Sequence, residues 1–298
     1  GTGLNLSISG GRPNSNVFRM DGIVINDHAN SSPGSIGGAN LGVDAIREFS
    51  ALTNTYSAEY GRASGGVINT VLRSGTNDVH GSAFFFHRNK SLDARNYFNP
   101  KGVPQFRRHQ YGGTFGGPLA KDRTFLFGAY EKLTEFREKE TSATVPTAAA
   151  KAGTLTSGNV TVNAAMQPLL GLYPDPTAGT TDGNVGTLHG APGSGVEADF
   201  MTLRGDHQFT DNLFYHGSYL IEDAALQTVD SFQLNERYDT SRRQFISSEF
   251  TYLISPTVIS ATRFGYNRSN MVTGDSKALK PELTLANSPT NLAFVPGR

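Results

Sequence analysis

Two groups of polar side chains are the first candidates for chemistry in this sequence of 298 residues. They are Asp27, His28 and Asn30 in one loop-like stretch, and Arg95, Asn96 and Tyr97 in another. Side chains of these types hold a polar ligand through charge, hydrogen bonds and ring contacts, and such groups converge in binding pockets. We therefore expect both groups to line an outward-facing ligand vestibule. The alternative is that they are ordinary solvated loop residues.

Motifs for catalysis and for cofactor binding are absent from the sequence. The patterns G-x-S-x-G, H-E-x-x-H, G-x-G-x-x-G and G-x-x-x-x-G-K-[ST] do not occur. The seven histidines lie far apart without ligand spacing, and the lack of cysteine removes thiolate sites and disulfides. Calcium binding would require scattered Asp and Asn ligands. We expect no catalytic residue, no cofactor and no metal site.

The balance of charge argues against some classes of partner. Lys plus Arg and Asp plus Glu number 26 each, so no overall field attracts nucleic acid, and we expect none as a partner.

The longest apolar runs are a few residues, whereas a membrane-spanning helix needs about 20. The chain opens with "GTGLNLSISG" and ends with "FVPGR", from which we expect an internal fragment of a longer protein.

Residues 1–78 have the pattern of a small α/β unit. Asp21 and Gly22 stand between two short apolar runs, and this pair favours a tight hairpin turn. The stretch "VDAIREFSAL" predicts a helical turn that runs into a strand, and "GGVINTVL" predicts a further strand. The glycines at 61, 65 and 66 permit close backbone approach, although glycine also serves generic turns.

From residue 79 the pattern changes to aromatic-rich segments of about ten residues, which is the length of a tilted strand that crosses a bilayer. We expect about seven such strands. They are residues 79–89, 107–118, 123–138, 198–209, 212–223, 242–254 and 257–269.

Two of these segments show the alternation most clearly. In 212–223 the odd positions from 213 to 221 are mainly apolar, whereas the even positions mix apolar and polar residues. In 242–254 the even positions from 246 to 254 are mainly apolar, and Glu249 lies on the opposite face. We expect the apolar faces to meet lipid.

The connections between the segments alternate in length. "PLAKD", "TD" and "SPT" are tight turns, whereas 90–106, 139–197, 224–241 and the stretch from 270 onward are long and polar. A soluble sandwich has no reason to segregate loop lengths in this way, but an outer-membrane barrel does. The fold prediction is a mainly β protein: an incomplete antiparallel transmembrane β-barrel wall of about seven strands, as an open curved sheet, with a small α/β domain.

The order of several motifs resembles one known family. Asp21-Gly22, "IREF", "EYG", "GGVIN" and "SGTN" before an aromatic strand resemble the C-terminal part of a TonB-dependent receptor plug followed by its barrel. "GGTFGGPL" and "RTFLFGAYE" add similarity to the Oar-like branch. The plug signature positions are Asp21, Gly22, Ile46, Glu48, Tyr60, Gly61, Gly65, Gly66 and Asn69.

The resemblance implies an architecture and a function. Residues 1–78 would be the C-terminal part of the plug, and 79–298 the first strands and long outer loops of a 22-stranded barrel in the bacterial outer membrane. The receptor would face membrane lipid, bind a small extracellular solute such as an oligosaccharide or peptide, and admit it to the periplasm. Energy would come from the inner-membrane TonB complex through an upstream segment that is not in this sequence.

Three charged residues could connect the plug to the barrel under this resemblance. Arg62 and Arg73 in the plug could pair with Glu249 on the mixed face of the wall, as a latch that holds the plug. The alternative is that these charges are solvated in the lumen.

Two other functions remain open from the sequence. One is a non-transporting surface barrel or adhesin, and the other is a soluble β-rich carbohydrate-binding module. The chain also departs from iron-siderophore receptors, because "SALTNTYSAEYG" stands where those have a V-x-x-G-P turn. Iron-chelate specificity is therefore not expected.

Overall fold

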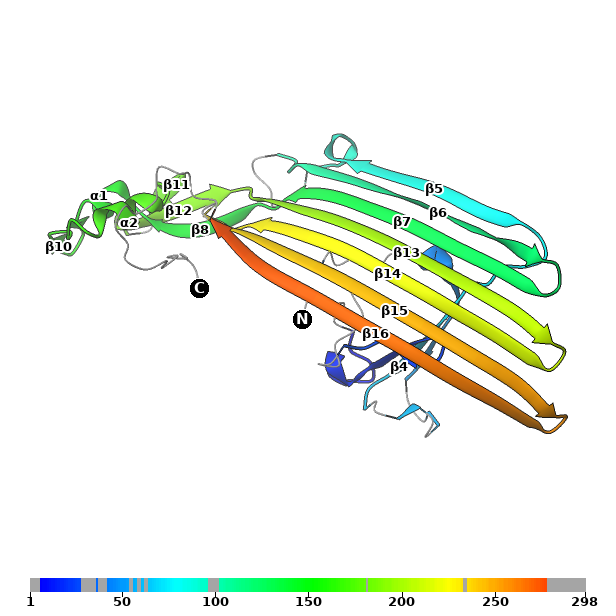
Figure 1. Ribbon diagram of the computed structural model, residues 1–298. Coiled ribbons are helices and arrows are strands. Elements are labelled where there is room, and N and C mark those ends of the chain that lie inside the picture. The colour runs from blue at the N-terminus through cyan, green and yellow to red at the C-terminus, as the bar shows by residue number, and fades with distance from the viewer. Residues whose placement is uncertain are drawn as a thin grey trace.

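A large antiparallel sheet dominates the computed structural model of the chain (Figure 1). The structure describes residues 6–27, 36, 42–53, 56–57, 60–61, 64–95, 102–180, 182–232 and 235–277. Within this part, the seven-stranded sheet is accompanied by a four-stranded sheet near the N-terminus and by smaller sheets at one end.

The four-stranded sheet, called the small sheet below, is mixed in strand direction. Its order is β2-β1-β4-β3, with β1 parallel to β4 and the other pairs antiparallel. The elements of this region are η1 Pro13–Ser15, β1 Val17–Met20, β2 Ile23–Val24, η2 Val43–Ala45, β3 Ile46–Leu52 and β4 Val67–Leu72. The predicted hairpin and the predicted turn before a strand are present as β1–β2 and η2–β3. In the described residues of this region the helical component is limited to 3-10 turns.

The seven-stranded sheet, called the wall below, has the order β16-β15-β14-β13-β7-β6-β5. Each neighbouring pair is antiparallel. Its strands are β5 His80–Asn89, β6 Phe106–Ala120, β7 Thr124–Glu138, β13 Gly193–Thr210, β14 Leu213–Val229, β15 Asn235–Ser255 and β16 Val258–Lys277. The prediction of an open antiparallel sheet of seven strands is confirmed.

The later strands are longer than the sequence predicted. β15 has 21 residues and β16 has 20, whereas segments of about ten were expected. Most of the predicted loop 224–241 and the start of the one from 270 are therefore strand. The expectation relied on aromatic content, whereas the β14–β15 ladder continues past the predicted ends through pairs such as Thr228–Arg237.

The predicted long loop 139–197 also carries structure. Strands β11, β12 and β8 form a three-stranded sheet, and a short hairpin and two short helices lie beside it (Figure 1). The elements are β8 Thr141–Pro146, α1 Ala148–Lys151, β9 Thr154–Leu155, β10 Gly158–Asn159, α2 Gln167–Leu172, β11 Ala178–Thr180 and β12 Val185–Gly190. α2 ends just before Tyr173 and Pro174. A further 3-10 turn, η4 Lys90–Leu92, follows β5.

Alternation along the wall strands separates two faces. On β14 the even positions Ser218, Leu220 and Glu222 are buried, whereas the odd positions are more exposed. On β15 the predicted lipid-facing positions Ile246 and Phe250 are exposed. The mixed face of the wall therefore points inward, toward the small sheet, and the apolar face points outward as predicted.

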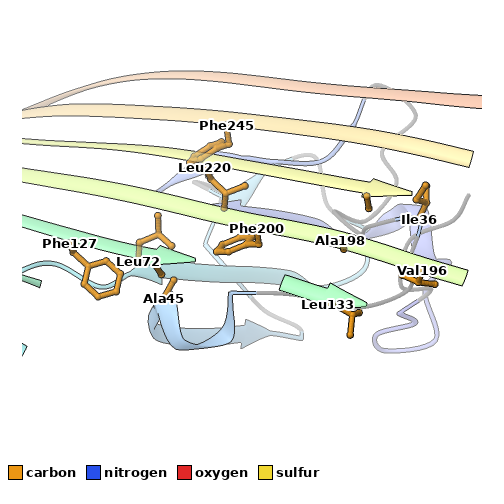
Figure 2. Packing of buried hydrophobic residues seen from close by; sticks show 12 residues of the cluster. Ile36, Ala45, Leu72, Phe127, Leu133, Val196, Ala198, Phe200, Leu220 and Phe245 are labelled. Atoms are coloured by element: carbon orange, nitrogen blue, oxygen red, sulfur yellow. The ribbon is translucent and has the colours of Figure 1, made fainter. Parts of the chain in front are cut away.

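The hydrophobic core lies between the two sheets. Ala45 and Leu72 come from the small-sheet region and share one buried cluster with Phe127, Phe200, Leu220 and Phe245 of the wall (Figure 2). Phe127 and Leu72 are each 1% exposed. The inward face of the wall is thus filled by the small sheet where the two meet.

The contrast between the two faces predicts unequal costs for the same substitution. Phe127→Ala should lower the free energy of unfolding by about 3–5 kcal/mol, because it opens a cavity in the core. Phe115→Ala on the neighbouring strand should cost much less, because Phe115 is 65% exposed on the outward face. Urea unfolding of the full-length protein in lipid vesicles measures both values, and equal losses would contradict the assignment of the faces.

Candidate functional site: the contact between the small sheet and the wall

The β1–β2 turn carries Asp21, whose carboxylate contacts the wall. Asp21 and Gly22 both have positive φ, 46° and 80°, as a two-residue hairpin turn of the primed type requires. The main-chain N–H of Asp21 donates to Thr70 O at 3.0 Å, which fixes the turn against β4. The turn therefore places the Asp21 side chain where it can reach both the end of β4 and the wall.

The Asp21 carboxylate is buried and accepts hydrogen bonds from both sheets. It accepts from the main-chain N–H of Leu72 at 3.1 Å and from Ser218 Oγ of β14 at 3.1 Å. Arg204 of β13 donates to it from Nη1 at 3.3 Å. The two side chains are 2% and 12% exposed, so this ion pair is largely withdrawn from water.

Arg204 donates hydrogen bonds to further partners. Its guanidinium donates to Asp206 on the same strand, at 2.9 Å from Nη2, and to the carbonyl of Leu72 at 3.2 Å. On the other side Ser218 Oγ lies 2.5 Å from Ser247 Oγ of β15. A continuous polar chain therefore joins the small sheet to three adjacent wall strands. A buried ion pair is sustained by such additional hydrogen bonds.

A second polar contact lies before η2. Glu131 of β7 is 5% exposed and accepts the main-chain N–H of Gly42 at 2.7 Å. Gln110 of β6 donates to the other oxygen of Glu131 at 2.5 Å. Gly42 has φ +82°, and a Cβ there would lie 2.2 Å from the ring of Phe200. The close approach of this loop to the wall therefore requires glycine.

A third contact involves the last described strand. Asn267 Nδ2 of β16 donates to the carbonyl of Asn26 at 3.0 Å. A Cβ on Gly265 would lie 2.4 Å from Ile23, and one on Gly22 would lie 3.4 Å from Arg263. Glycine again permits the small sheet to approach the wall closely.

The plug signature positions have different places in this arrangement. Asp21 makes the contact itself, and Gly22 packs under Arg263. Cβ atoms on Gly65 and Gly66 would meet Asn16 and Ile8 within the small-sheet region, which supports close packing there over a generic turn. The remaining positions serve the small sheet or its turns, and they are Ile46, Glu48, Tyr60, Gly61 and Asn69.

The latch residues have partners other than one another. Arg73 Nε donates to Ile46 O at 3.1 Å, and Glu249 accepts from Arg263, its direct cross-strand neighbour, and from Thr251. Arg62 lies outside the described residues. Among the residues that the structure describes, the ion pair that joins the two sheets is Asp21–Arg204, with the acid on the small sheet and the base on the wall. Glu249 is paired within the wall, and the latch stays a prediction, because Arg62 is not among the described residues.

The expected vestibule residues fall partly outside the described chain. Asp27 is half-buried after β2, and Arg95 is exposed after η4. His28, Asn30, Asn96 and Tyr97 lie outside the described residues. The vestibule therefore stays a prediction.

Arg204, Ser218 and Glu131 were not singled out from the sequence. Arg204 and Glu131 each carry a charge in line with apolar inward positions of the same strand, such as Phe200 on β13 and Phe127 on β7, and this pattern is the signal that could have found them. Ser218 carries no such signal, because a serine on a mixed face has no distinctive pattern. Among the described residues, no group of three or more histidine or acidic side chains is placed to hold a metal ion. None of the described helices is long and apolar enough to cross a bilayer.

The buried ion pair predicts a specific effect of neutralising Asp21. Asp21→Asn should lower the stability of the contact by about 1–3 kcal/mol, because Arg204 keeps Asp206 but loses one buried partner. Amide hydrogen exchange of the full-length protein should then become faster in residues 17–24 and 67–72. Asp175→Asn is the control, because Asp175 and its ion-pair partner Lys151 of α1 lie outside both the small sheet and the wall. Wild-type protection in the Asp21 variant would contradict a holding role.

Comparison with known proteins places the wall in a family. The profile of the family described as outer membrane beta barrel domain matches residues 71–297. The TonB-dependent transporter Oar of Myxococcus xanthus is 33% identical over 135 residues, which is 42% of this chain and 12% of the relative. The chain thus matches a small part of that protein's length.

A solved structure shares the fold. The outer membrane transporter YddB of Escherichia coli superposes with a TM-score of 0.59 at 13% identity, over 88% of this chain and 32% of that one. These findings confirm the predicted outer-membrane location and the resemblance. They set aside the soluble carbohydrate-binding module. The chain therefore belongs to the outer membrane beta barrel domain family, and over 135 residues it is a homologue of a TonB-dependent transporter.

Proposed function

We propose that the full-length protein is a TonB-dependent transporter that binds an extracellular solute and admits it to the periplasm when its plug moves. In this proposal residues 1–78 are the C-terminal part of the plug, and 79–298 are the first strands and outer loops of the barrel. The observation that carries the proposal is the buried contact of the small sheet with the inward face of the wall. The relative's description as a TonB-dependent transporter supports it.

The contact has properties that suit a plug that is held and then released. Its polar part is concentrated in a few directional bonds at Asp21, Gly42 and Asn26, rather than in a continuous ladder between the two sheets. A force on the small sheet would need to break these bonds together with the packing of Ala45 and Leu72. TonB, acting through an upstream segment, is the proposed source of that force.

The solute is proposed to bind above the small sheet, where the loops with Asp27, His28, Asn30, Arg95, Asn96 and Tyr97 would converge. The polar and aromatic character of these residues fits an oligosaccharide or a peptide. The chemistry of the proposed site is binding, without a catalytic step.

A disulfide between the small sheet and the wall would test whether movement is required. A Cβ on Gly265 would lie 2.4 Å from a side-chain atom of Ile23, so cysteines at 23 and 265 fall near the usual disulfide Cβ separation of about 3.8 Å. The sequence has no cysteine of its own, so the Ile23→Cys/Gly265→Cys pair has no competing thiol in this chain.

Cells that produce the full-length variant would be given a panel of fluorescein-labelled oligosaccharides and peptides. We expect uptake to require TonB, to stop when the disulfide forms, and to return after reduction, while surface binding persists throughout. Single-cysteine variants are the controls. Surface binding without TonB-dependent uptake would favour the adhesin alternative and overturn transport.

A further inference from the structure

Two histidines are direct cross-strand partners in the wall. His87 of β5 faces His109 of β6, although 22 residues separate them in the sequence. The ring centroids lie 4.7 Å apart, and the two Nδ1 atoms lie 3.3 Å apart. We call these two residues the histidine pair. The sequence has no ligand spacing between its histidines, and strand pairing is what brings these two together.

The histidine pair lies on the outward face of the wall. Odd-numbered positions of β6 share one face, and Phe115 in this row is 65% exposed. His87 is exposed and His109 is half-buried. Both rings therefore have a side that is open to the surroundings of the barrel.

The side chains around the pair change from aromatic to polar at its level. Phe85 and Tyr111 are the next partners toward the short turns, whereas Asn89 and Arg107 are the next partners in the other direction. On β7 the same level continues with Thr134. The histidine pair therefore lies at the border of the apolar band, where dissolved ions have access to it.

The separation of the two nitrogens fits one metal ion with tetrahedral geometry. Zn–N bonds are about 2.0–2.1 Å long, so two imidazole nitrogens on one tetrahedral zinc ion lie about 3.3 Å apart. Neighbouring ligands of a square-planar ion, at the same bond length, would lie about 2.9 Å apart. The observed Nδ1–Nδ1 distance of 3.3 Å matches the tetrahedral value.

The protonation of the pair is compatible with such an ion. The contact between the two Nδ1 atoms is a hydrogen bond when one ring donates and the other accepts. A metal ion needs a lone pair from both Nδ1 atoms. The donor ring supplies its lone pair by carrying its proton on Nε2 instead, so both rings stay neutral.

We propose that the histidine pair binds one zinc ion through its two Nδ1 atoms, with water in the two remaining positions. Neutral imidazole is a preferred ligand of zinc, whereas hard cations such as Mg²⁺ prefer oxygen ligands. In the part of the chain that the structure describes, no third histidine or acidic side chain joins the pair. The ion is therefore exchangeable with the medium.

The bound ion would act as a clip between two strands. β5 is the end strand of the described wall and has β6 as its neighbour there. A zinc bridge between His87 and His109 would fix the register of these strands near the polar end of β5.

The site is separate from the proposed transport function. It lies on the face of the wall opposite to the small sheet, and it takes a metal ion instead of the transported solute. Zinc binding can therefore fail while transport holds, and the reverse.

Histidine labelling tests the site at single residues. Full-length protein in detergent, purified through a tag without histidine, is treated with diethyl pyrocarbonate, and the modified residues are located by peptide mass spectrometry. We expect Zn²⁺ to slow the modification of His87 and His109, because bound zinc occupies Nδ1 and Nε2 carries a proton. His189 of β12 is exposed and serves as the control whose rate stays unchanged.

Mg²⁺ at the same concentration provides a control for the ion. We expect it to protect neither member of the histidine pair. Unchanged labelling of the pair in Zn²⁺, or equal protection by Mg²⁺, would overturn the proposed site.

Two variants of β5 test the affinity by calorimetric titration with Zn²⁺. His87→Gln removes one ligand from an exposed position, and His80→Gln makes the same change at an exposed position of the same strand. Loss of an outer-shell partner already weakens metal binding about 10–100-fold, so loss of a direct ligand should weaken it at least about tenfold. We expect this loss in His87→Gln alone.

The comparison between these variants isolates the histidine pair. Any zinc site elsewhere in the full-length protein is common to both variants, and heat-modifiable gel mobility establishes that each barrel is folded. Equal zinc binding by His87→Gln and His80→Gln would refute the site.

Discussion

The buried pair of Asp21 and Arg204 is the interaction on which the relation between the two sheets depends. Burial of a carboxylate is costly unless it is paired and hydrogen-bonded, and Asp21 has donors from β4, β13 and β14. The pair therefore requires the β1–β2 turn, the end of β4 and two wall strands to be in place together. Hydrophobic packing of Leu72 and Phe127 supplies attraction, but the ion pair supplies direction, because it is satisfied in one relative position of the sheets.

Glycine permits this arrangement at the points where backbone must approach side chain. Gly42 lies under the ring of Phe200, and Gly265 lies beside Ile23. Any side chain at these positions would separate the small sheet from the wall and lengthen the polar bonds. Glycine also permits close approach within the wall, where a Cβ on Gly113 of β6 would lie 2.7 Å from the main-chain oxygen of Ser82 on β5. Glycine in this chain thus serves both the contact between the two sheets and the pairing of strands within the wall.

Much of the fold could be predicted from the sequence, because periodicity and turn chemistry are local. The alternation around residues 213–221 gave the orientation of β14, and Asp21-Gly22 gave the first hairpin. Strand ends could not be predicted in the same way, since polar cross-strand pairs such as Thr228–Arg237 continue the ladder beyond the predicted segments. The partner of Asp21 also could not be predicted, because Arg204 is 183 residues away and only tertiary structure brings them together. The latch of Arg62 and Arg73 with Glu249 stays a prediction, because Arg62 lies outside the described residues.

The length of β15 has a consequence for what surrounds the cell. Its 21 residues extend about 70 Å at about 3.3 Å per residue. With a tilt of about 40° the strand rises about 50 Å, which is twice the apolar band of about 25 Å. The end of β15 next to β14 therefore stands clear of the bilayer. Phe232, between these two strands, packs edge-on against Tyr173, which follows α2. These raised elements therefore lie in water, beyond the reach of the bilayer that surrounds the rest of the wall.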